Sequence, residues 1–237
     1  MPKLPHVRQI IEPLPRSGKW NMAVDEALLQ SAIERGTATL RWYMWEPTVS
    51  LGYFQNEADL QSDPRLGSLP RVRRLSGGGT LVHDRELTYS LTLPASQSLI
   101  TRPTELYRIV HGCIAAVLQS RGADVVLRGV TVKNPVEPVL CFAREDEHDL
   151  VLQGHKVLGS AQRRRRGSIL QHGGLLLAAS PYTPELLGLR ELCPDLDFAG
   201  LTESLGAAIV AVVAEAWGNA TLTVQELEYS ATAAKAC

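Results

Sequence analysis

Residues 149–162 read Asp-Leu-Val-Leu-Gln-Gly-His-Lys-Val-Leu-Gly-Ser-Ala-Gln, which is the pattern of a β-hairpin. Two apolar runs flank Gln153-Gly154, and a two-residue loop containing glycine is the usual hairpin connection. Strict alternation places the side chains after the turn on two faces: Lys156, Leu158 and Ser160 on one, and His155, Val157 and Ala161 on the other. A lysine among small or apolar residues indicates either an edge strand exposed to solvent or a functional site.

The rest of the chain alternates many short strands with a few unevenly spaced helices. Strands are predicted at 7–11, 39–45, 48–53, 80–83, 87–93, 125–127 and 221–224. Helices are predicted at 20–34, 104–121 and 201–217, with a helical turn at 184–189. Segments 80–83 and 87–93 are expected to pair as a hairpin. Without regular βαβ alternation, the pattern predicts one α+β domain over 1–237, with a mixed, mostly antiparallel sheet flanked by helices.

The composition is that of a soluble globular enzyme, with 45% hydrophobic and 21% charged residues. A net charge of -1 argues against binding to nucleic acid in bulk. No apolar stretch approaches the roughly 20 residues of a membrane span, and the N-terminus has no secretory h-region. We therefore expect a cytoplasmic protein that binds neither nucleic acid nor membranes.

Four cysteines stand at 113, 141, 193 and 237, without a Cys-x-x-Cys pair. This spacing predicts neither a disulfide framework nor a metal site and fits a reducing compartment. Cys113 falls on the apolar face of a helix, and Cys237 is the terminal residue. Cys141 and Cys193 lie in loop-like contexts and are the candidate nucleophiles. Cys141 precedes the hairpin, where the cation of Lys156 would lower a thiol pKa.

A glycine-rich segment, Ser76-Gly77-Gly78-Gly79, lies between two predicted strands. It lacks the strand-to-helix context of a P-loop or a dinucleotide fingerprint. Successive glycines let the backbone approach a ligand closely, and exposed N–H groups can bind a carbonyl or phosphate oxygen. A flexible turn is the alternative. Arg73 before the glycines and His83 after them favour a binding loop.

Two further polar segments have both a structural and a functional interpretation. His172, at the start of an apolar run, is either structural or a base or orienting group for a nearby cysteine. The arginine run 163–166 is either a solvated turn or an electrostatic landing site for an acidic carrier protein.

Several motifs resemble lipoate–protein ligases and octanoyltransferases, which belong to the biotin/lipoate protein ligase superfamily. The similar segments are 21–28, 41–47, 50–55, 73–84, 154–162 and 171–173. The resemblance covers about residues 17–177. It implies a single biotin/lipoate protein ligase-like catalytic domain over 1–237, and we expect no C-terminal accessory domain of the kind that many such ligases carry.

The segment before the hairpin decides between the activities of this superfamily. Lipoate ligases that use ATP typically carry Gly-Arg-Asn-Asp ahead of the lysine hairpin. Here residues 141–147 read Cys-Phe-Ala-Arg-Glu-Asp-Glu. This resembles octanoyltransferases whose nucleophile lies in that loop, which favours Cys141. A second octanoyltransferase type has its cysteine after the His-Gly motif, which keeps Cys193 as a candidate.

The resemblance implies transfer of an octanoyl or lipoyl group from acyl carrier protein to a lysine of a lipoyl domain. Such domains occur in the E2 subunits of 2-oxoacid dehydrogenases and in the glycine cleavage H protein. The Cys141 thiolate would form a thioester acyl-enzyme, and Lys156 would lower its pKa and stabilise the oxyanion. The implied substrate-binding residues are Arg73, Ser76, Gly77, Gly78, Gly79, His83, Gly159, Ser160, Ala161 and His172.

No cofactor is expected for this reaction. ATP and Mg²⁺ would be required only if the chain were a lipoate ligase that forms lipoyl-AMP. The same motifs are also compatible with a lipoyl-protein amidotransferase. A non-catalytic module that binds carrier or lipoyl domains would share them too, because a fold does not by itself imply its chemistry.

Overall fold

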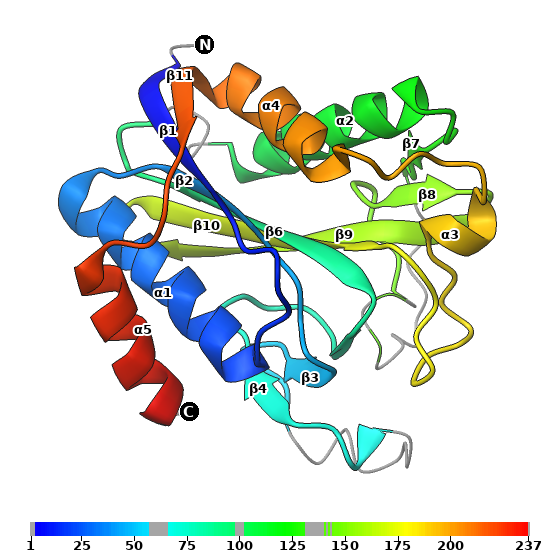
Figure 1. The fold of residues 1–237 in the computed structure, drawn as a ribbon, viewed down its shortest axis with the longest axis horizontal. Coiled ribbons are helices and arrows are strands. Elements are labelled where there is room, and N and C mark those ends of the chain that lie inside the picture. The colour runs from blue at the N-terminus through cyan, green and yellow to red at the C-terminus, as the bar shows by residue number, and fades with distance from the viewer. Residues whose placement is uncertain are drawn as a thin grey trace.

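The computed structural model describes residues 3–56, 66–97, 102–130, 140, 142 and 144–236. Its centre is an eight-stranded sheet in the order β11-β1-β2-β6-β10-β9-β8-β7 (Figure 1). A second sheet has the order β4-β3-β5. The strands are β1 (Leu4–Ile11), β2 (Thr39–Tyr43), β3 (Thr48–Leu51), β4 (Arg71–Arg73), β5 (Leu81–His83), β6 (Glu86–Leu93), β7 (Val126–Leu127), β8 (Leu150–Leu152), β9 (His155–Arg165), β10 (Ser168–Leu176) and β11 (Ala214–Asn219).

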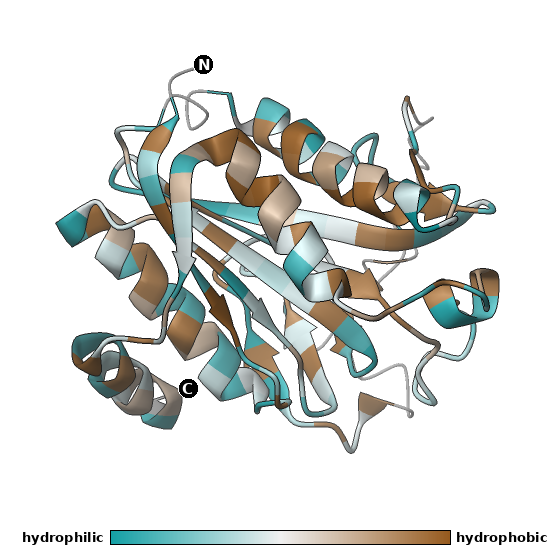
Figure 2. Ribbon diagram, turned by 45° about the horizontal axis from the view of Figure 1, so that its top comes forward, coloured by the Kyte–Doolittle hydropathy of each residue, from teal (hydrophilic) through white to brown (hydrophobic). Residues whose placement is uncertain are grey.

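Helices cover both faces of the large sheet. They are α1 (Gly18–Arg35), α2 (Pro103–Ser120), α3 (Leu189–Leu192), α4 (Leu201–Val213) and α5 (Val224–Ala236). Helices α2 and α4 lie side by side over one face, α1 crosses the other, and α5 packs on α1 (Figures 1 and 2). Because parallel and antiparallel pairs occur together, the expected α+β class with a mixed sheet is confirmed.

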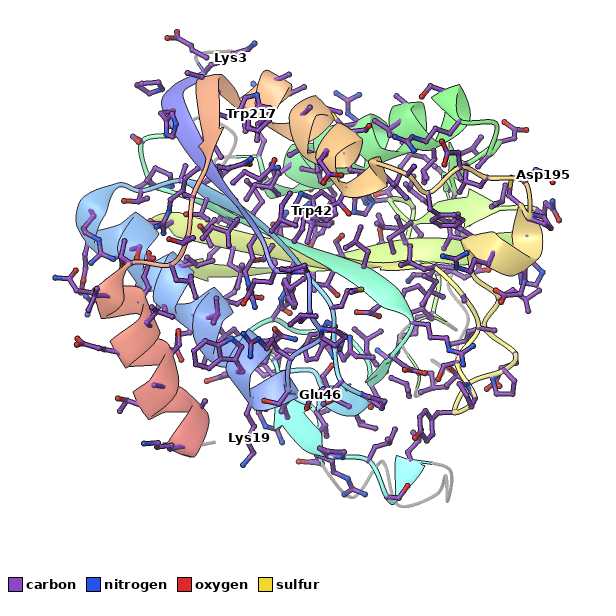
Figure 3. All side chains as sticks on the ribbon, viewed as in Figure 1. Lys3, Lys19, Trp42, Glu46, Asp195 and Trp217 are labelled. Carbon is purple, nitrogen blue, oxygen red and sulfur yellow. The ribbon has the colours of Figure 1, made fainter. Side chains whose placement is uncertain are left out.

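The main hydrophobic core lies between the large sheet and helices α2 and α4. Alternate residues of β6, from Leu87 to Leu93, point into it together with the apolar faces of both helices. Trp42 on β2 belongs to the same core and is almost completely buried (Figure 3). The 3.6-residue apolar period of α2, which predicted this helix, is explained by its packing on the sheet.

The predicted hairpin over residues 80–93 is wrong. β5 pairs antiparallel with β3 in the small sheet, whereas β6 pairs with β2 and β10 in the large one. Asp84 and Arg85 therefore carry the chain from one sheet to the other. The backbone pairs of both segments are made with distant strands, which a local alternation pattern does not reveal.

The predictions near the C-terminus are also partly wrong. The helix predicted to reach residue 217 ends at Val213, and Ala214–Asn219 forms β11, parallel to β1. The strand predicted at 221–224 is absent from this region, where α5 begins at Val224. The helical turn predicted at 184–189 lies further along the chain, as the short helix α3 at Leu189–Leu192. The free edge of β1 explains the first difference, because pairing with it overrides helix propensity.

The lysine hairpin itself is confirmed as β8 and β9. Gln153 and Gly154 both have positive φ, 50° and 82°, as a two-residue hairpin turn of the I′ type requires. A bulge changes the faces, however, since Leu150 pairs with Leu158 and Val151 with Lys156. The extra residue puts Val157 and Leu158 both into the core. The predicted sharing of a face by Lys156 and Leu158 is therefore wrong.

Candidate active site

A cavity of about 300 Å³ opens beside the centre of the large sheet. Its floor comes from β6, β9 and β10, and its walls come from the glycine-rich segment, from α2 and from the residues that precede the lysine hairpin. Lys156, Gly159, Ser160, Ala161 and His172, all predicted site residues, lie in this lining.

Two glycines make the floor of this cavity flat. Gly159 on β9 pairs directly with Gly174 on β10. A Cβ added at Gly159 would lie 2.6 Å from Lys156 Cε, and one at Gly174 would lie 2.9 Å from Glu86 Oε2. These distances are too short for a real Cβ, so the glycines allow two charged side chains to lie flat on the sheet. We call Gly159 and Gly174 the glycine floor.

Lys156 is buried in an ion pair. Its Nζ lies 2.9 Å from Asp149 Oδ1, and the two side chains are 6% and 4% exposed. The same ammonium donates to the carbonyl oxygen of Arg144 at 3.2 Å and lies 5.5 Å from the Phe142 ring centre. Burial raises the pKa of Asp149, against the opposing charge and hydrogen bond of Lys156. This carboxylate compensates the buried ammonium.

Asp149 is a site residue that the sequence analysis missed. The backbone N–H of Asp146 donates to Asp149 Oδ2 at 2.8 Å, which fixes the second carboxylate oxygen. The sequence could have identified Asp149 as a partner of Lys156. It stands directly before β8, and the two arms of a hairpin bring residues 149 and 156 together.

Cys141 lies outside the described residues. Its chain neighbours are both described at this site: Leu140 forms an isolated bridge with Thr80, and Phe142 lines the cavity. The segment that precedes the hairpin therefore reaches Lys156 at Phe142 and Arg144.

The glycine-rich segment turns its carbonyl groups into the protein. Arg74 donates to the carbonyl oxygens of Gly77 and Gly79, at 3.3 and 2.7 Å. The N–H of Tyr53 donates to the carbonyl oxygen of Ser76 at 2.9 Å. With these oxygens engaged, the segment can offer a ligand oxygen its N–H groups. Gly78 and Gly79 line the cavity, whereas Ser76 and Gly77 are not part of its lining.

His172 is held from both ring nitrogens. Nδ1 lies 3.2 Å from Asp25 Oδ2, and Nε2 lies 2.5 Å from Ser76 Oγ. Asp25 is itself bound by Arg41 at 3.0 Å and by Tyr43 at 2.9 Å. Burial acts to raise the pKa of Asp25, but its bonds to His172 and the charge of Arg41 outweigh it and leave this pKa lowered. His172 thus ties the glycine-rich segment to α1.

A second buried histidine, His83, ties β3 of the small sheet to β6 of the large sheet. His83 Nδ1 lies 2.7 Å from Glu86 Oε1, and Nε2 lies 2.5 Å from Ser50 Oγ. Its ring stacks on Trp45 with centroids 3.8 Å apart. Burial lowers the pKa of His83, which favours the neutral ring. Glu86 and Trp45 line the cavity and were missed, because their roles depend on contacts between the two sheets.

A third histidine, His111 on α2, also lines the cavity and was missed. Its Nε2 lies 2.7 Å from Ser160 Oγ, which lies 2.8 Å from Tyr89 Oη. Burial lowers the pKa of His111 to about 4, and it raises the pKa of Tyr89. The helical period that predicted α2 gave no sign that one turn faces a polar cavity.

Arg73 and Cys193, like Ser76 and Gly77, are predicted residues that lie outside the lining of this cavity. Arg73 is exposed and donates to the carbonyl oxygens of Gly52, Tyr53 and Gln55, and Arg74 takes the place beside the cavity. Cys193 ends α3, with its Sγ 3.9 Å from the carbonyl oxygen of Gly122.

The arginine run forms the end of β9 and the turn into β10. The Arg163 guanidinium lies 4.7 Å from the Tyr53 ring centre, and Arg165 pairs with Glu26 at 3.2 Å.

Neither a metal centre nor a membrane span is found in the described part of the chain. Among these residues, no three His, Cys, Asp or Glu side chains gather closely enough to hold a metal ion. No described helix combines the length and the apolar character needed to cross a membrane.

Comparison with known proteins adds sequence relatives. Residues 17–183 match the family described as Lipoyl protein ligase A/B catalytic domain. The octanoyltransferase LipM of Anoxybacillus flavithermus is 40% identical over 177 residues, which are 68% of this chain and 62% of that protein. LipM of Bacillus subtilis is 38% identical over 174 residues, again 68% and 62%. The match thus spans about three fifths of the length of these curated relatives.

Solved structures share the fold at low sequence identity. A lipoate-protein ligase A bound with ATP has a TM-score of 0.73 at 20% identity, covering 97% of this chain and 94% of that one. A bipartite lipoate protein ligase from Thermoplasma acidophilum, studied with its E2 lipoyl domain, has a TM-score of 0.74 at 18% identity, covering 98% and 92%. The expected lipoate protein ligase-like fold is confirmed.

Proposed function

This chain belongs to the lipoyl protein ligase A/B catalytic domain family, and we propose that it transfers an octanoyl group from acyl carrier protein to a lysine of a lipoyl domain. The curated relatives named octanoyltransferase LipM support this reaction. The observation that carries the proposal is the buried ammonium of Lys156, which lies in one cavity with Gly78, Gly79 and Phe142, the chain neighbour of Cys141.

In the first step, the Cys141 thiolate bonds to the acyl carbon of the carrier-bound thioester. The bond from that carbon to the phosphopantetheine sulfur breaks, and the departing thiolate takes up a proton. In the second step, the neutral amine of the acceptor lysine bonds to the same carbon. The Cys141 thiolate leaves and the nitrogen loses its extra proton. Two such steps replace one difficult direct transfer.

Lys156 is the group that stabilises the developing oxyanion in both steps. Its position over the glycine floor is fixed by Asp149, so the ammonium needs little reorganisation when charge develops. A preorganised donor of this kind contributes roughly 3 kcal/mol to transition-state binding. The N–H groups of Gly78 and Gly79, which line the same cavity, supply further donors.

The acyl chain occupies the apolar part of the cavity. Tyr43, Trp45, Leu81 and Phe142 supply apolar surface there. Each buried methylene contributes about 0.8 kcal/mol, so an eight-carbon chain gains substantially from this slot.

The decisive experiment is intact-protein mass spectrometry after mixing the chain with octanoyl carrier protein. We expect an increase in mass by one octanoyl group, located on Cys141 after digestion. The Cys141→Ser variant should form no thioester adduct, and Lys156→Met should form it about 100-fold more slowly. Cys193→Ser is the matched control and should be labelled like the unchanged protein.

Two results would contradict this function. Labelling of Cys193 in place of Cys141 would reject the assigned nucleophile. Absence of any adduct, combined with release of pyrophosphate from ATP and lipoate, would identify a lipoate ligase.

A further inference from the structure

We propose that Glu86 binds the ammonium group of the acceptor lysine and so selects a primary amine for the second half-reaction. This inference rests on the proposed acyl transfer and assigns the residue that receives the acceptor. It starts from a carboxylate in the floor of the cavity with one oxygen that has no partner among the described residues.

Glu86 is a buried carboxylate that is only half engaged. It is 1% exposed. Oε1 lies 2.7 Å from His83 Nδ1 and accepts from Thr88 Oγ1 at 2.6 Å. Oε2 accepts no hydrogen bond from any residue in the described part of the chain. A buried carboxylate oxygen without a donor is costly, so a ligand that supplies a donor would be stabilised here.

Glu86 lies beside the proposed reacting centre. Its carboxylate rests over Gly174, and the Lys156 ammonium rests over Gly159. These two glycines are directly paired across β10 and β9, and paired Cα atoms are about 5 Å apart. A nitrogen bound to Glu86 Oε2 is therefore close to an acyl group held at Lys156.

The other carboxylates described in the cavity lining are already engaged. Asp149 pairs with Lys156, Asp146 accepts from His148, and Glu145 pairs with Arg128. An incoming ammonium also meets repulsion from Lys156, which carries the same charge. The Oε2 atom of Glu86 offsets that repulsion with a charge-assisted hydrogen bond.

The state of the His83–Glu86 pair fits this role. Burial acts to raise the pKa of Glu86, but the charge and hydrogen bond of His83 and the bond from Thr88 leave it lowered. Burial lowers the pKa of His83. The bonds from His83 and Thr88 to Oε1 hold the carboxylate in place and leave Oε2 to accept from a ligand.

The chemistry of the two substrates makes the role specific to the acceptor. The pantetheine thioester is uncharged at its reacting end and needs no counterion there. A lysine arrives mostly as an ammonium, because its usual pKa is about 10.4. It gives one proton to bulk water before the neutral amine bonds to the acyl carbon, and Glu86 Oε2 accepts a hydrogen bond from one of the remaining N–H groups. Glu86 therefore acts on the amine step and leaves the acylation step unchanged.

The test separates the two steps in Glu86→Gln. The variant is octanoylated with carrier protein, then divided between a lipoyl domain and a small thiol, N-acetylcysteamine. We expect acylation and transfer to the thiol to stay within about twofold of the unchanged protein, and transfer to the lipoyl lysine to fall about 30-fold, which corresponds to losing one charge-assisted hydrogen bond. Equal losses toward amine and thiol, or no loss toward the amine, would overturn the inference.

Glu226→Gln is the matched control, because it removes another buried carboxylate far from the cavity. It should leave the ratio of amine to thiol transfer unchanged.

If Glu86→Gln does not fold, trimethylammonium is tested against tert-butanol as an inhibitor of amine transfer by the unchanged acyl-enzyme. Inhibition by the cation alone supports the inference, and equal inhibition rejects it. Failure of the unchanged protein to form an acyl-enzyme would instead reject the proposed function.

Discussion

At the scale of single residues, the site depends on charges that compensate one another inside the protein. Lys156 was predicted from its unusual place in a strand, and the structure places it in the cavity. Asp149 was overlooked although the hairpin pattern brings it to Lys156. Glu86 was not predicted, since a carboxylate at a strand end has the same sequence context whether it is solvated or buried. The role of Glu86 depends on neighbours across strands, which only the fold defines.

The Lys156–Asp149 pair makes a quantitative prediction for stability. Asp149→Asn leaves the buried ammonium without its carboxylate, so we expect the free energy of unfolding to fall by about 3 kcal/mol. The double variant Lys156→Met with Asp149→Asn should recover much of this loss. Urea unfolding of the two single variants and the double variant measures the coupling. Purely additive losses would mean that the pair has no net interaction.

At the scale of elements, the sequence predicts the strands and helices themselves better than it predicts which strands pair with one another. The hairpin turn at Gln153-Gly154 was recognisable because it needs positive φ at both positions. The bulge opposite Leu150 was not, because one extra residue leaves the apolar pattern almost unchanged. Residues Ala214–Asn219 continue the helical pattern of the preceding segment, but they form a strand because they pair with β1.

The glycine floor is a feature of two paired strands, and a substitution that adds one methyl group tests it. Gly174→Ala places a Cβ within 3.0 Å of the Glu86 carboxylate. We expect the free energy of unfolding to fall by about 1–3 kcal/mol through overpacking.

Gly112→Ala in α2 is the matched control for this substitution. A Cβ at Gly112 meets no atom within 4 Å. We expect this variant to gain about 0.5–1 kcal/mol, because alanine favours a helix over glycine. Thermal and urea unfolding of both variants measure the difference. A stabilised Gly174→Ala variant would contradict the proposed tightness of the floor.

At the scale of the whole molecule, the α+β class followed from the irregular order of short strands and helices. The last helix could not be predicted in place, because its position depends on contacts with the first strand and first helix. Glu226 on α5 pairs with Arg8 of β1 and accepts from Ser31 of α1 at 2.5 Å. These partners come from opposite ends of the sequence, beyond the reach of a local pattern.

This link predicts how stability depends on pH. Burial acts to raise the pKa of Glu226, but bonds from Arg8 and Ser31 outweigh it and lower the pKa to about 2. A lowered carboxylate pKa stabilises the folded state above the unfolded value, near pH 4.5, and this stability is lost as the pH falls toward 2. We expect a contribution on the order of 2 kcal/mol.

Urea unfolding between pH 7 and pH 2 measures this contribution. Glu226→Gln should lose stability at pH 7 and show a weaker decline over the acid range. Glu46→Gln, on the loop between β2 and β3 (Figure 3), is the exposed control. Parallel pH curves for the unchanged protein and Glu226→Gln would contradict the assignment.

The central place of β10 has a consequence for hydrogen exchange. β10 pairs on both sides along most of its length, with β6 and with β9. Its amide protons are therefore released only when the whole sheet opens, whereas amides in solvated turns are released by local opening. The floor under the reacting groups should belong to the slowest-exchanging set of the molecule. A substitution that speeds amide exchange in β10 must lower the stability of the whole protein. Such a variant would lose the glycine floor and the fold together.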